Sequence, residues 1–245
     1  MNRQGNTYTI LYSIALVLLV GVALSIVYQA LRPKQEENIA NDTRRQILAS
    51  SRIIPSGNED VAALWKQHIT DSFIVDADGK KCDSNVNPDD INVAAESKLP
   101  PAERRLPVYV CLTDDGQKYI LPVYGAGLWG PIWGYVSFDS NGQTIYGAYF
   151  AHQGETPGLG AEIEKPKFQD QFEGKQIFSS SGQFTGVAVS KAGQAPEGKA
   201  SVNAISGGTI TSQGVERMLD NCLKPYSAFL QHLATDHNDT QQSQS

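Results

Sequence analysis

A long uncharged segment near the N-terminus places the strongest constraint on how this chain can fold. No charged residue occurs between Gln4 and Leu31, and the apolar run Ile10–Val27 has tyrosines on both sides. At about 1.5 Å per residue, roughly 20 such residues in a helix cross a hydrocarbon core about 30 Å thick. Tyrosine is typical of membrane–water interfaces. We therefore predict a transmembrane helix over residues 8–31, preceded by a short segment of residues 1–7.

A cleaved signal peptide is the alternative for this segment, with Arg3 in its basic region and Ala23-Leu24-Ser25 as a cleavage site. The apolar run favours a retained helix, because it is long for a signal peptide and continues through Val27. Several Lys and Arg residues follow the run and only one precedes it. Because Lys and Arg are more frequent on the cytoplasmic side of a span, this count weakly favours that side for the rest of the chain.

The remainder of the chain is acidic and long enough for one folded domain. After residue 31 it holds 19 Lys and Arg against 26 Asp and Glu, a net charge of −7 that argues against nucleic-acid binding. About 210 residues can form one sizeable core. We predict a juxtamembrane helix or linker over residues 32–55, a domain over residues 56–234 and a disordered tail over residues 235–245.

Hairpin signals recur within this domain. Asp-Gly or Asn-Gly turns follow apolar runs that end at Val75, Cys111 and Phe138, and further strand-like runs lie at 119–123, 144–150 and 185–189. Hairpin-grouped strands with helices mainly towards the ends indicate an α+β fold with one antiparallel sheet and packed helices.

The segment Ser206-Gly207-Gly208-Thr209-Ile210-Thr211 precedes an amphipathic helix and is a candidate phosphate site. Backbone N–H groups and the helix dipole favour an anion at such a helix start. The Thr209 hydroxyl is also placed to become covalently joined to a phosphate. An ordinary turn with Thr211 or Ser212 as N-cap is the alternative. The helix has apolar residues at helical spacing from Val215 to Leu223, and Pro225 ends or kinks it.

Two further loops carry more than turn chemistry. Gly125–Gly134 contains two tryptophans among four glycines, which can form an apolar wall beside an accessible backbone. His152–Gly160 combines glycines and a proline with Glu155 and Thr156. His152 and Glu155 are too few for a metal site, and Thr209 lacks the companions of a nucleophilic hydrolase.

The three cysteines cannot all pair with one another. Cys222 lies on the apolar face of the helix that follows Thr209, and we predict a buried small hydrophobe there. Cys82 and Cys111 could form a disulfide in an oxidising compartment, but no local pattern decides this.

Taken together, three segments resemble the covalent FMN-binding domain family: Gly127-Leu128-Trp129, Glu155-Thr156-Pro157-Gly158-Leu159-Gly160 and Ser206-Gly207-Gly208-Thr209-Ile210-Thr211. With its single span, the chain is similar to the C subunits of sodium-translocating NADH:quinone reductases over nearly all of residues 1–233. The family motif has Asp and Ala where this chain has Asn203 and Gly208. Asn203 lacks the negative charge of that Asp, which the resemblance implies as a feature for recognition by the modifying transferase.

The resemblance implies that a flavin transferase joins one FMN per chain to Thr209 through a phosphoester, and that the protein relays electrons towards quinone. It implies neither a catalytic residue nor a metal ligand in this protein. It also implies a six-subunit assembly in the inner membrane, with the soluble domain on the periplasmic side. This side is opposite to the one that the count of Lys and Arg around the span weakly favours. The implied cofactor-binding residues are Thr209, Ser206, Gly207, Gly208, Thr211, Trp129, Leu128, Gly127, Glu155, Thr156, Gly158 and Leu159.

Three alternatives remain open at the level of sequence. The G subunits of Rnf-type ferredoxin:NAD reductases have the same domain and span. Because Asn203 departs from the family's flavin-attachment motif, a membrane-anchored interaction module without flavin is the second alternative. A hydrolase with Thr209 as nucleophile would react with acylating reagents and carry no flavin.

Overall fold

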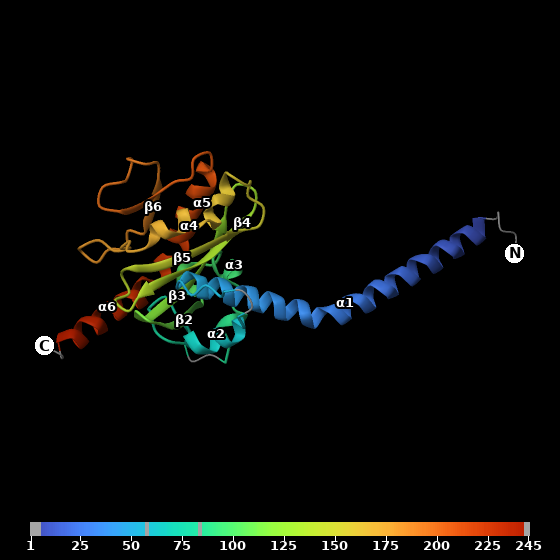
Figure 1. Cartoon of the computed structure of the whole chain (residues 1–245), viewed down its shortest axis with the longest axis horizontal. Helices are drawn as coiled ribbons and strands as arrows, with labels where there is room; N and C mark the ends of the chain where they lie inside the picture. The colour runs from blue at the N-terminus through green and yellow to red at the C-terminus, as the bar shows by residue number, and fades with distance from the viewer. Residues whose placement is uncertain (1–5, 57–58, 83–84, 243–245) are drawn as a thin grey trace. The chain divides into compact units, whose positions relative to one another are not determined.

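The computed structural model describes residues 6–56, 59–82 and 85–242, and the chain divides into two compact units between Thr43 and Arg44. Helix α1 (Asn6–Ser50) supplies the first unit and begins the second (Figure 1). The other α-helices and strands, in chain order, are α2 (Val61–His68), β1 (Ile69–Val75), α3 (Val93–Glu96), β2 (Leu106–Thr113), β3 (Gly116–Ala126), β4 (Pro131–Asp139), β5 (Ile145–His152), α4 (Pro166–Gln169), β6 (Val187–Ser190), β7 (Ala200–Asn203), α5 (Thr209–Leu223) and α6 (Ser227–Gln242). Short 3-10 helices lie at Pro88–Asp90, Pro101–Glu103, Gly160–Glu164, Asp170–Phe172 and Lys224–Tyr226.

Helix α1 is long and apolar enough in its N-terminal part to cross a membrane, and none of its most apolar window is buried. The expected helix over 8–31 and residues 32–50 of the expected helix or linker over 32–55 lie in one continuous helix that includes Pro33. It ends where Arg52 adopts a φ of 62° and Ile53 N–H donates to the Leu48 carbonyl at 3.1 Å. This is the Schellman arrangement that stops many helices.

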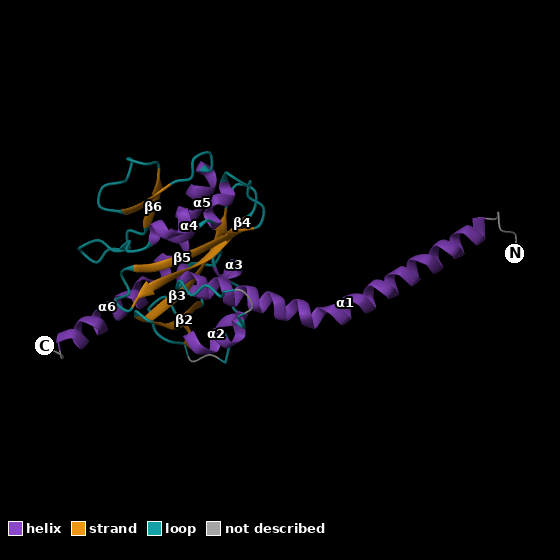
Figure 2. Ribbon diagram, viewed as in Figure 1, coloured by secondary structure: helices purple, strands orange, loops and turns teal. Residues whose placement is uncertain are grey.

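The core of the second unit is a five-stranded antiparallel sheet in the order β1-β2-β3-β4-β5 (Figure 2). The antiparallel α+β expectation is therefore confirmed. The β2–β3 and β4–β5 hairpins turn at the expected Asp-Gly and Asn-Gly signals, with Gly116 and Gly142 at positive φ. Strands β6 and β7 form a separate pair that is parallel, which the local sequence pattern did not indicate.

Alternating residues of the sheet face two different apolar clusters. Val108, Leu121 and Val136 face the larger cluster, which includes residues of α5 and α6. Tyr109, Cys111 and Ile120 face a smaller cluster with Ile47 from the end of α1 and Trp65 from α2. The sheet is thus covered on both faces, and α5 packs on the face opposite the end of α1.

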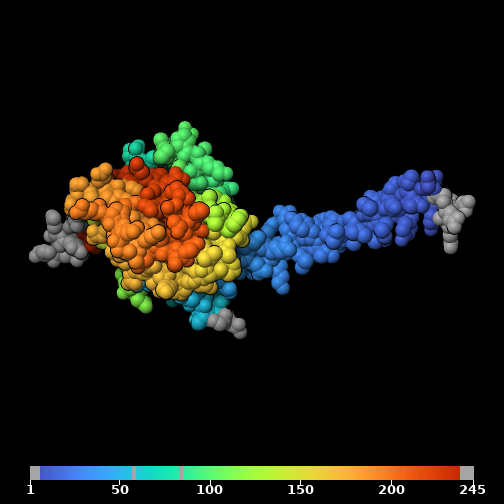
Figure 3. Space-filling view, turned by 90° about the horizontal axis from the view of Figure 1, so that it is seen from above, coloured from blue at the N-terminus to red at the C-terminus, as the bar shows by residue number. Residues whose placement is uncertain are grey.

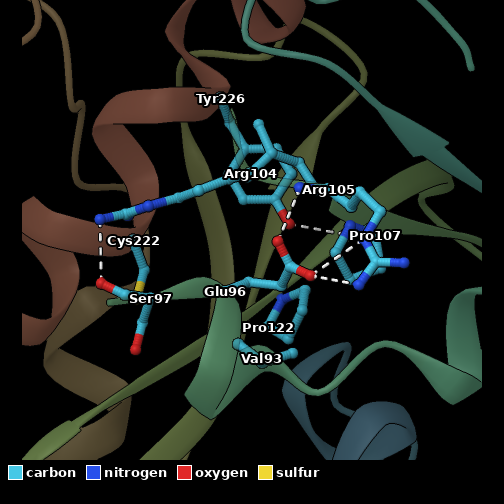
Figure 4. A pocket seen from close by; sticks show the side chains of 10 residues that line it. Val93, Glu96, Ser97, Arg104, Arg105, Pro107, Pro122, Cys222 and Tyr226 are labelled. Atoms are coloured by element: carbon cyan, nitrogen blue, oxygen red, sulfur yellow. Dashed lines mark hydrogen bonds and ion pairs between the residues drawn. The ribbon is translucent and has the colours of Figure 1, made fainter. Parts of the chain in front are cut away.

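Buried polar contacts hold the segment before β2 against α5. The Arg104 guanidinium donates to the carbonyls of Leu99 at 2.8 Å, Ser97 at 2.9 Å and Asn221 at 2.7 Å. Figure 4 shows this side chain reaching towards Ser97, beside the ion pair of Arg105 with Glu96. Because Asn221 lies in α5, these bonds connect α5 to the sheet at its far end from Thr209.

Two expectations about the C-terminal region differ in outcome. Helix α5 ends at Leu223, one residue before the 3-10 turn that contains Pro225, as predicted. Of the disordered tail predicted over residues 235–245, residues 235–242 belong to α6, which continues to Gln242, and residues 243–245 lie outside the described residues. Phe229 and Leu230 of α6 are buried in the larger cluster, and this packing supports a helix that composition alone did not predict.

The cysteines have no disulfide within the described part of the chain. Cys222 is buried as expected, and its Sγ lies 3.4 Å from Tyr124 N and 3.3 Å from Tyr124 O. Burial raises the pKa of its thiol above the ordinary value. Cys222 therefore acts as a packed side chain of α5.

Candidate functional site

Three loops from different parts of the chain meet at the N-terminus of α5. They are residues 127–130 between β3 and β4, residues 153–159 after β5, and residues 204–208 between β7 and α5. Figure 3 looks onto this face, where yellow-green, yellow and orange-red segments lie side by side. The loops enclose a cavity of about 380 Å³, within the range typical of small-molecule sites. Its lining residues are Leu128, Trp129, Glu155, Thr156, Leu159, Gly160, Gly207, Gly208, Thr209, Ile210 and Thr211.

The structure brings most of the sequence-predicted site residues to this cavity, and it separates three of them from it. Ser206 and Gly158 line a neighbouring cavity of about 670 Å³ instead. Gly127 lines neither cavity and lies behind Glu155. Sequence reasoning missed Gly160, although it belongs to the quoted motif, and Ile210, whose signal is an apolar residue in the first turn of a helix.

The start of α5 is open to a ligand. Ser212 N–H donates to the Gly208 carbonyl at 2.9 Å, so the N–H groups of Thr209, Ile210 and Thr211 precede the first helical hydrogen bond. The N-cap is Gly208, which makes no side-chain cap. The alternative of Thr211 or Ser212 as N-cap is therefore wrong: both lie inside the helix.

The hydroxyl groups of this segment differ in their partners. Thr211 is buried and donates to Glu155 Oε2 at 2.6 Å, while Ser212 is buried and its Oγ accepts from Ile205 N–H at 3.0 Å. Thr209 is exposed at the cavity. Its hydroxyl is consequently the accessible one of the helix start, beside N–H groups that favour an anion.

Exposed apolar side chains surround the cavity. Trp129 is 69% exposed, and Leu128, Leu159 and Ile210 are 46%, 42% and 50% exposed. Such a gathering on one face is typical of a surface that a ligand or partner covers. The second tryptophan, Trp133, is not part of this wall: its Nε1 donates to Gln46 Oε1 at 2.9 Å, on the side of the sheet covered by α1.

Glu155 is the buried charge of the site, with only 4% of its surface exposed. Its Oε1 accepts from Trp129 N–H at 2.8 Å and its Oε2 accepts from the Thr211 hydroxyl. Glu155 N–H in turn donates to His152 Nδ1 at 3.1 Å. Among the residues that the structure describes, no group of three potential metal ligands is present, and His152 with Glu155 forms a hydrogen-bonded turn.

The chain is similar to known proteins over the residues that form this site. The family model described as "FMN-binding domain" matches residues 127–224, which span all three loops and α5. The C subunit of the Na(+)-translocating NADH-quinone reductase of Vibrio anguillarum is 33% identical over 234 residues, covering 89% of this chain and 91% of that protein. Its counterpart in Chlamydia trachomatis is 27% identical over 298 residues, covering 93% and 92%.

The fold of this chain is also similar to that of a solved structure. The crystal structure of the C subunit of the Na(+)-translocating NADH-quinone reductase from Parabacteroides distasonis has 46% sequence identity and a TM-score of 0.75. The match covers 82% of this chain and 96% of that one.

Proposed function

Because the chain belongs to the family of C subunits of Na(+)-translocating NADH-quinone reductases, we propose that Thr209 carries FMN through a phosphoester and that this flavin relays electrons towards quinone. Its role as an FMN-binding electron carrier within a multisubunit reductase follows from the family itself. The covalent linkage and the relay are our proposal. The observation that carries it is the accessible Thr209 hydroxyl at an open helix N-terminus.

The residues of the cavity fit the parts of FMN. The N–H groups at the start of α5 would hold the phosphoester anion, since this is where a helix attracts negative charge. Leu128, Trp129, Leu159 and Ile210 would cover the flat ring and exclude water from one side of it. The bound flavin supplies the redox chemistry, and the protein supplies attachment, orientation and electrostatics.

Attachment requires an accessible acceptor, and the other hydroxyls of α5's first turn are committed. The net change joins Thr209 Oγ to the flavin phosphorus with loss of one water between the two partners. A flavin transferase is the proposed agent. Asn203 is exposed at the end of β7, and we propose that the transferase reaches this position.

The setting of the domain is also proposed. Helix α1 is the candidate membrane anchor. We propose that it crosses the inner membrane once, that the domain lies on the periplasmic side, and that the other subunits of a six-subunit reductase surround it.

Intact mass and peptide mapping after co-expression with a flavin transferase test the attachment. We expect one FMN less water on the peptide that contains Thr209. Thr209→Ala should remove the adduct completely and leave the fold unchanged, because the side chain is exposed. Ser206→Ala, which removes an exposed hydroxyl at the neighbouring cavity, is the matched control and should keep the adduct. An adduct that persists in Thr209→Ala would place the linkage elsewhere, and an unmodified wild-type chain with an active transferase would favour the flavin-free module.

A further inference from the structure

Glu155 connects two loops of the cavity and the first turn of α5 through one buried side chain. Trp129 N–H belongs to the loop before β4, the Thr211 hydroxyl belongs to the first turn of α5, and Glu155 itself lies in the loop after β5. We propose that Glu155 is a positioning residue: its carboxylate fixes these loops relative to one another and thereby shapes the flavin cavity, without bonding to the flavin. The part that concerns flavin rests on the proposed function.

The hydrogen bonds of Glu155 support positioning over direct flavin contact. Each carboxylate oxygen has one short donor from a different segment: Trp129 N–H from the loop before β4 at 2.8 Å, and the Thr211 hydroxyl from α5 at 2.6 Å. A buried carboxylate is stable only when donors replace its hydration, so neither bond is expendable. Only 4% of the Glu155 surface is exposed, which leaves little of the carboxylate for a flavin donor to reach.

The glycines beside Glu155 are explained by its carboxylate. A Cβ added at Gly127 would collide with Glu155 Oε1, and one added at Gly160 would collide with Glu155 Oε2 and lie 2.5 Å from Thr211 Oγ1. Neither glycine has a positive φ. Both positions are therefore small because the carboxylate packs directly against the backbone of its neighbouring loops.

The backbone of Glu155 is held as well as its side chain. Its N–H donates to His152 Nδ1 at 3.1 Å, and His152 N–H donates to Glu164 Oε1 at 3.2 Å. The imidazole Nδ1 must therefore be unprotonated, which fixes the tautomer with hydrogen on Nε2. The end of β5 thus helps to set the direction in which the carboxylate points.

The first test uses the full-length chain in detergent, expressed without transferase, so that no covalent flavin is present. Hydrogen exchange is measured at the Trp129 amide. In Glu155→Ala we expect its protection to fall by roughly tenfold or more, because hydrogen bonds to charged groups contribute at least that factor. Glu155→Gln should have a smaller effect, since one carboxamide oxygen can still accept one of the two donors. Glu103→Gln, the same charge change at an exposed site, should leave the amide unchanged.

A double-mutant cycle keeps the test decisive if Glu155→Ala folds poorly. Glu155→Gln, Thr211→Ala and the double variant are compared by the same amide exchange and by thermal unfolding. If the effect of the double variant is smaller than the sum of the two single effects, the two side chains are coupled. Such coupling supports a direct hydrogen bond between Glu155 and Thr211 that links the loop after β5 to α5. Strictly additive effects, or an unchanged Trp129 amide, would overturn the proposal whether or not Thr209 carries flavin.

The second readout uses the flavinylated chain. We expect Glu155→Gln to keep the adduct on Thr209, because the acceptor hydroxyl does not contact Glu155, but to shift the flavin reduction potential and lower its fluorescence anisotropy. The same charge change at an exposed site, Glu103→Gln, should move neither quantity. An adduct lost together with an unchanged Trp129 amide would instead make Glu155 a direct partner of flavin attachment, which contradicts the positioning role.

Discussion

At the scale of single residues, Trp129 separates the effect of a side chain on the flavin from its effect on the loop. Its backbone N–H bonds to Glu155, whereas its ring is 69% exposed at the cavity. Trp129→Ala should therefore keep the conformation of the loop and the Thr209 adduct, and remove only the proposed contact between the Trp129 ring and the flavin ring. Such contacts contribute about 0.5–1.5 kcal/mol, which corresponds to at most about 30 mV for a two-electron couple.

Redox titration and fluorescence of the flavinylated protein check this prediction. Trp133→Phe is the matched control, because Trp133 bonds to Gln46 on the other side of the sheet. We expect its flavin spectrum to match that of the wild type. An unchanged spectrum in Trp129→Ala, with the adduct intact, would show that Trp129 does not cover the ring.

The residue scale also shows which parts of the site were predictable from sequence. Thr209, Gly208 and Glu155 were found because glycine-rich loops and the helix start are local signals. The different environments of Trp129 and Trp133 were not predictable, since the sequence does not show that β4 begins at Pro131 and turns Trp133 towards α1. The bond between Glu155 and Thr211 joins residues 56 positions apart, and no local pattern encodes it.

At the scale of elements, the approach of α5 to β3 depends on small residues. A Cβ at Gly214 would lie 2.5 Å from the Ala126 carbonyl oxygen, which is backbone and cannot move aside as a side chain can. Gly214→Ala gains about 1 kcal/mol of helix propensity but overpacks the interface, at a cost of about 1–3 kcal/mol. We expect a net loss of stability, with the start of α5 displaced from the Gly127 loop.

Urea unfolding of a chain that begins at Arg44 measures this balance. Gln213→Ala is the control, because it lies one residue away in α5, is exposed and should change the midpoint only slightly. A Gly214→Ala midpoint equal to or above that of Gln213→Ala would mean that the helix is not held closely at this position.

The elements themselves were predictable to the extent that local chemistry specifies them. The hairpins β2–β3 and β4–β5 follow from turn residues between apolar runs. The pairing of β1 with β2 across residues 76–105, and the parallel pairing of β6 with β7, depend on contacts between distant segments. Helix α6 was missed because its stability comes from burying Phe229 and Leu230 rather than from composition.

At the scale of the whole molecule, the two units divide inside a helix rather than at its end. Ile47 and Leu48 at the end of α1 are fully buried in the second unit, and the expected boundary at residue 56 lies beyond them. A chain that begins at Arg44 should therefore be soluble and cooperatively folded. A chain that begins at Ile54 lacks both buried side chains, each of which contributes about 1.5–3 kcal/mol when fully buried.

Thermal unfolding of these two truncated chains decides where the domain begins. We expect the chain from Ile54 to unfold at a clearly lower temperature, because the face of the sheet with Tyr109 and Ile120 loses the part of its cover that Ile47 supplies. Ile47→Ala in the longer chain is the matched point variant and should cost about 2–5 kcal/mol of stability. Its unfolding midpoint should therefore lie between those of the two truncated chains. Equal midpoints for both truncated chains would assign the last turns of α1 to the membrane anchor. A lower midpoint for the shorter chain would make the end of the anchor helix an integral layer of the flavin-binding domain.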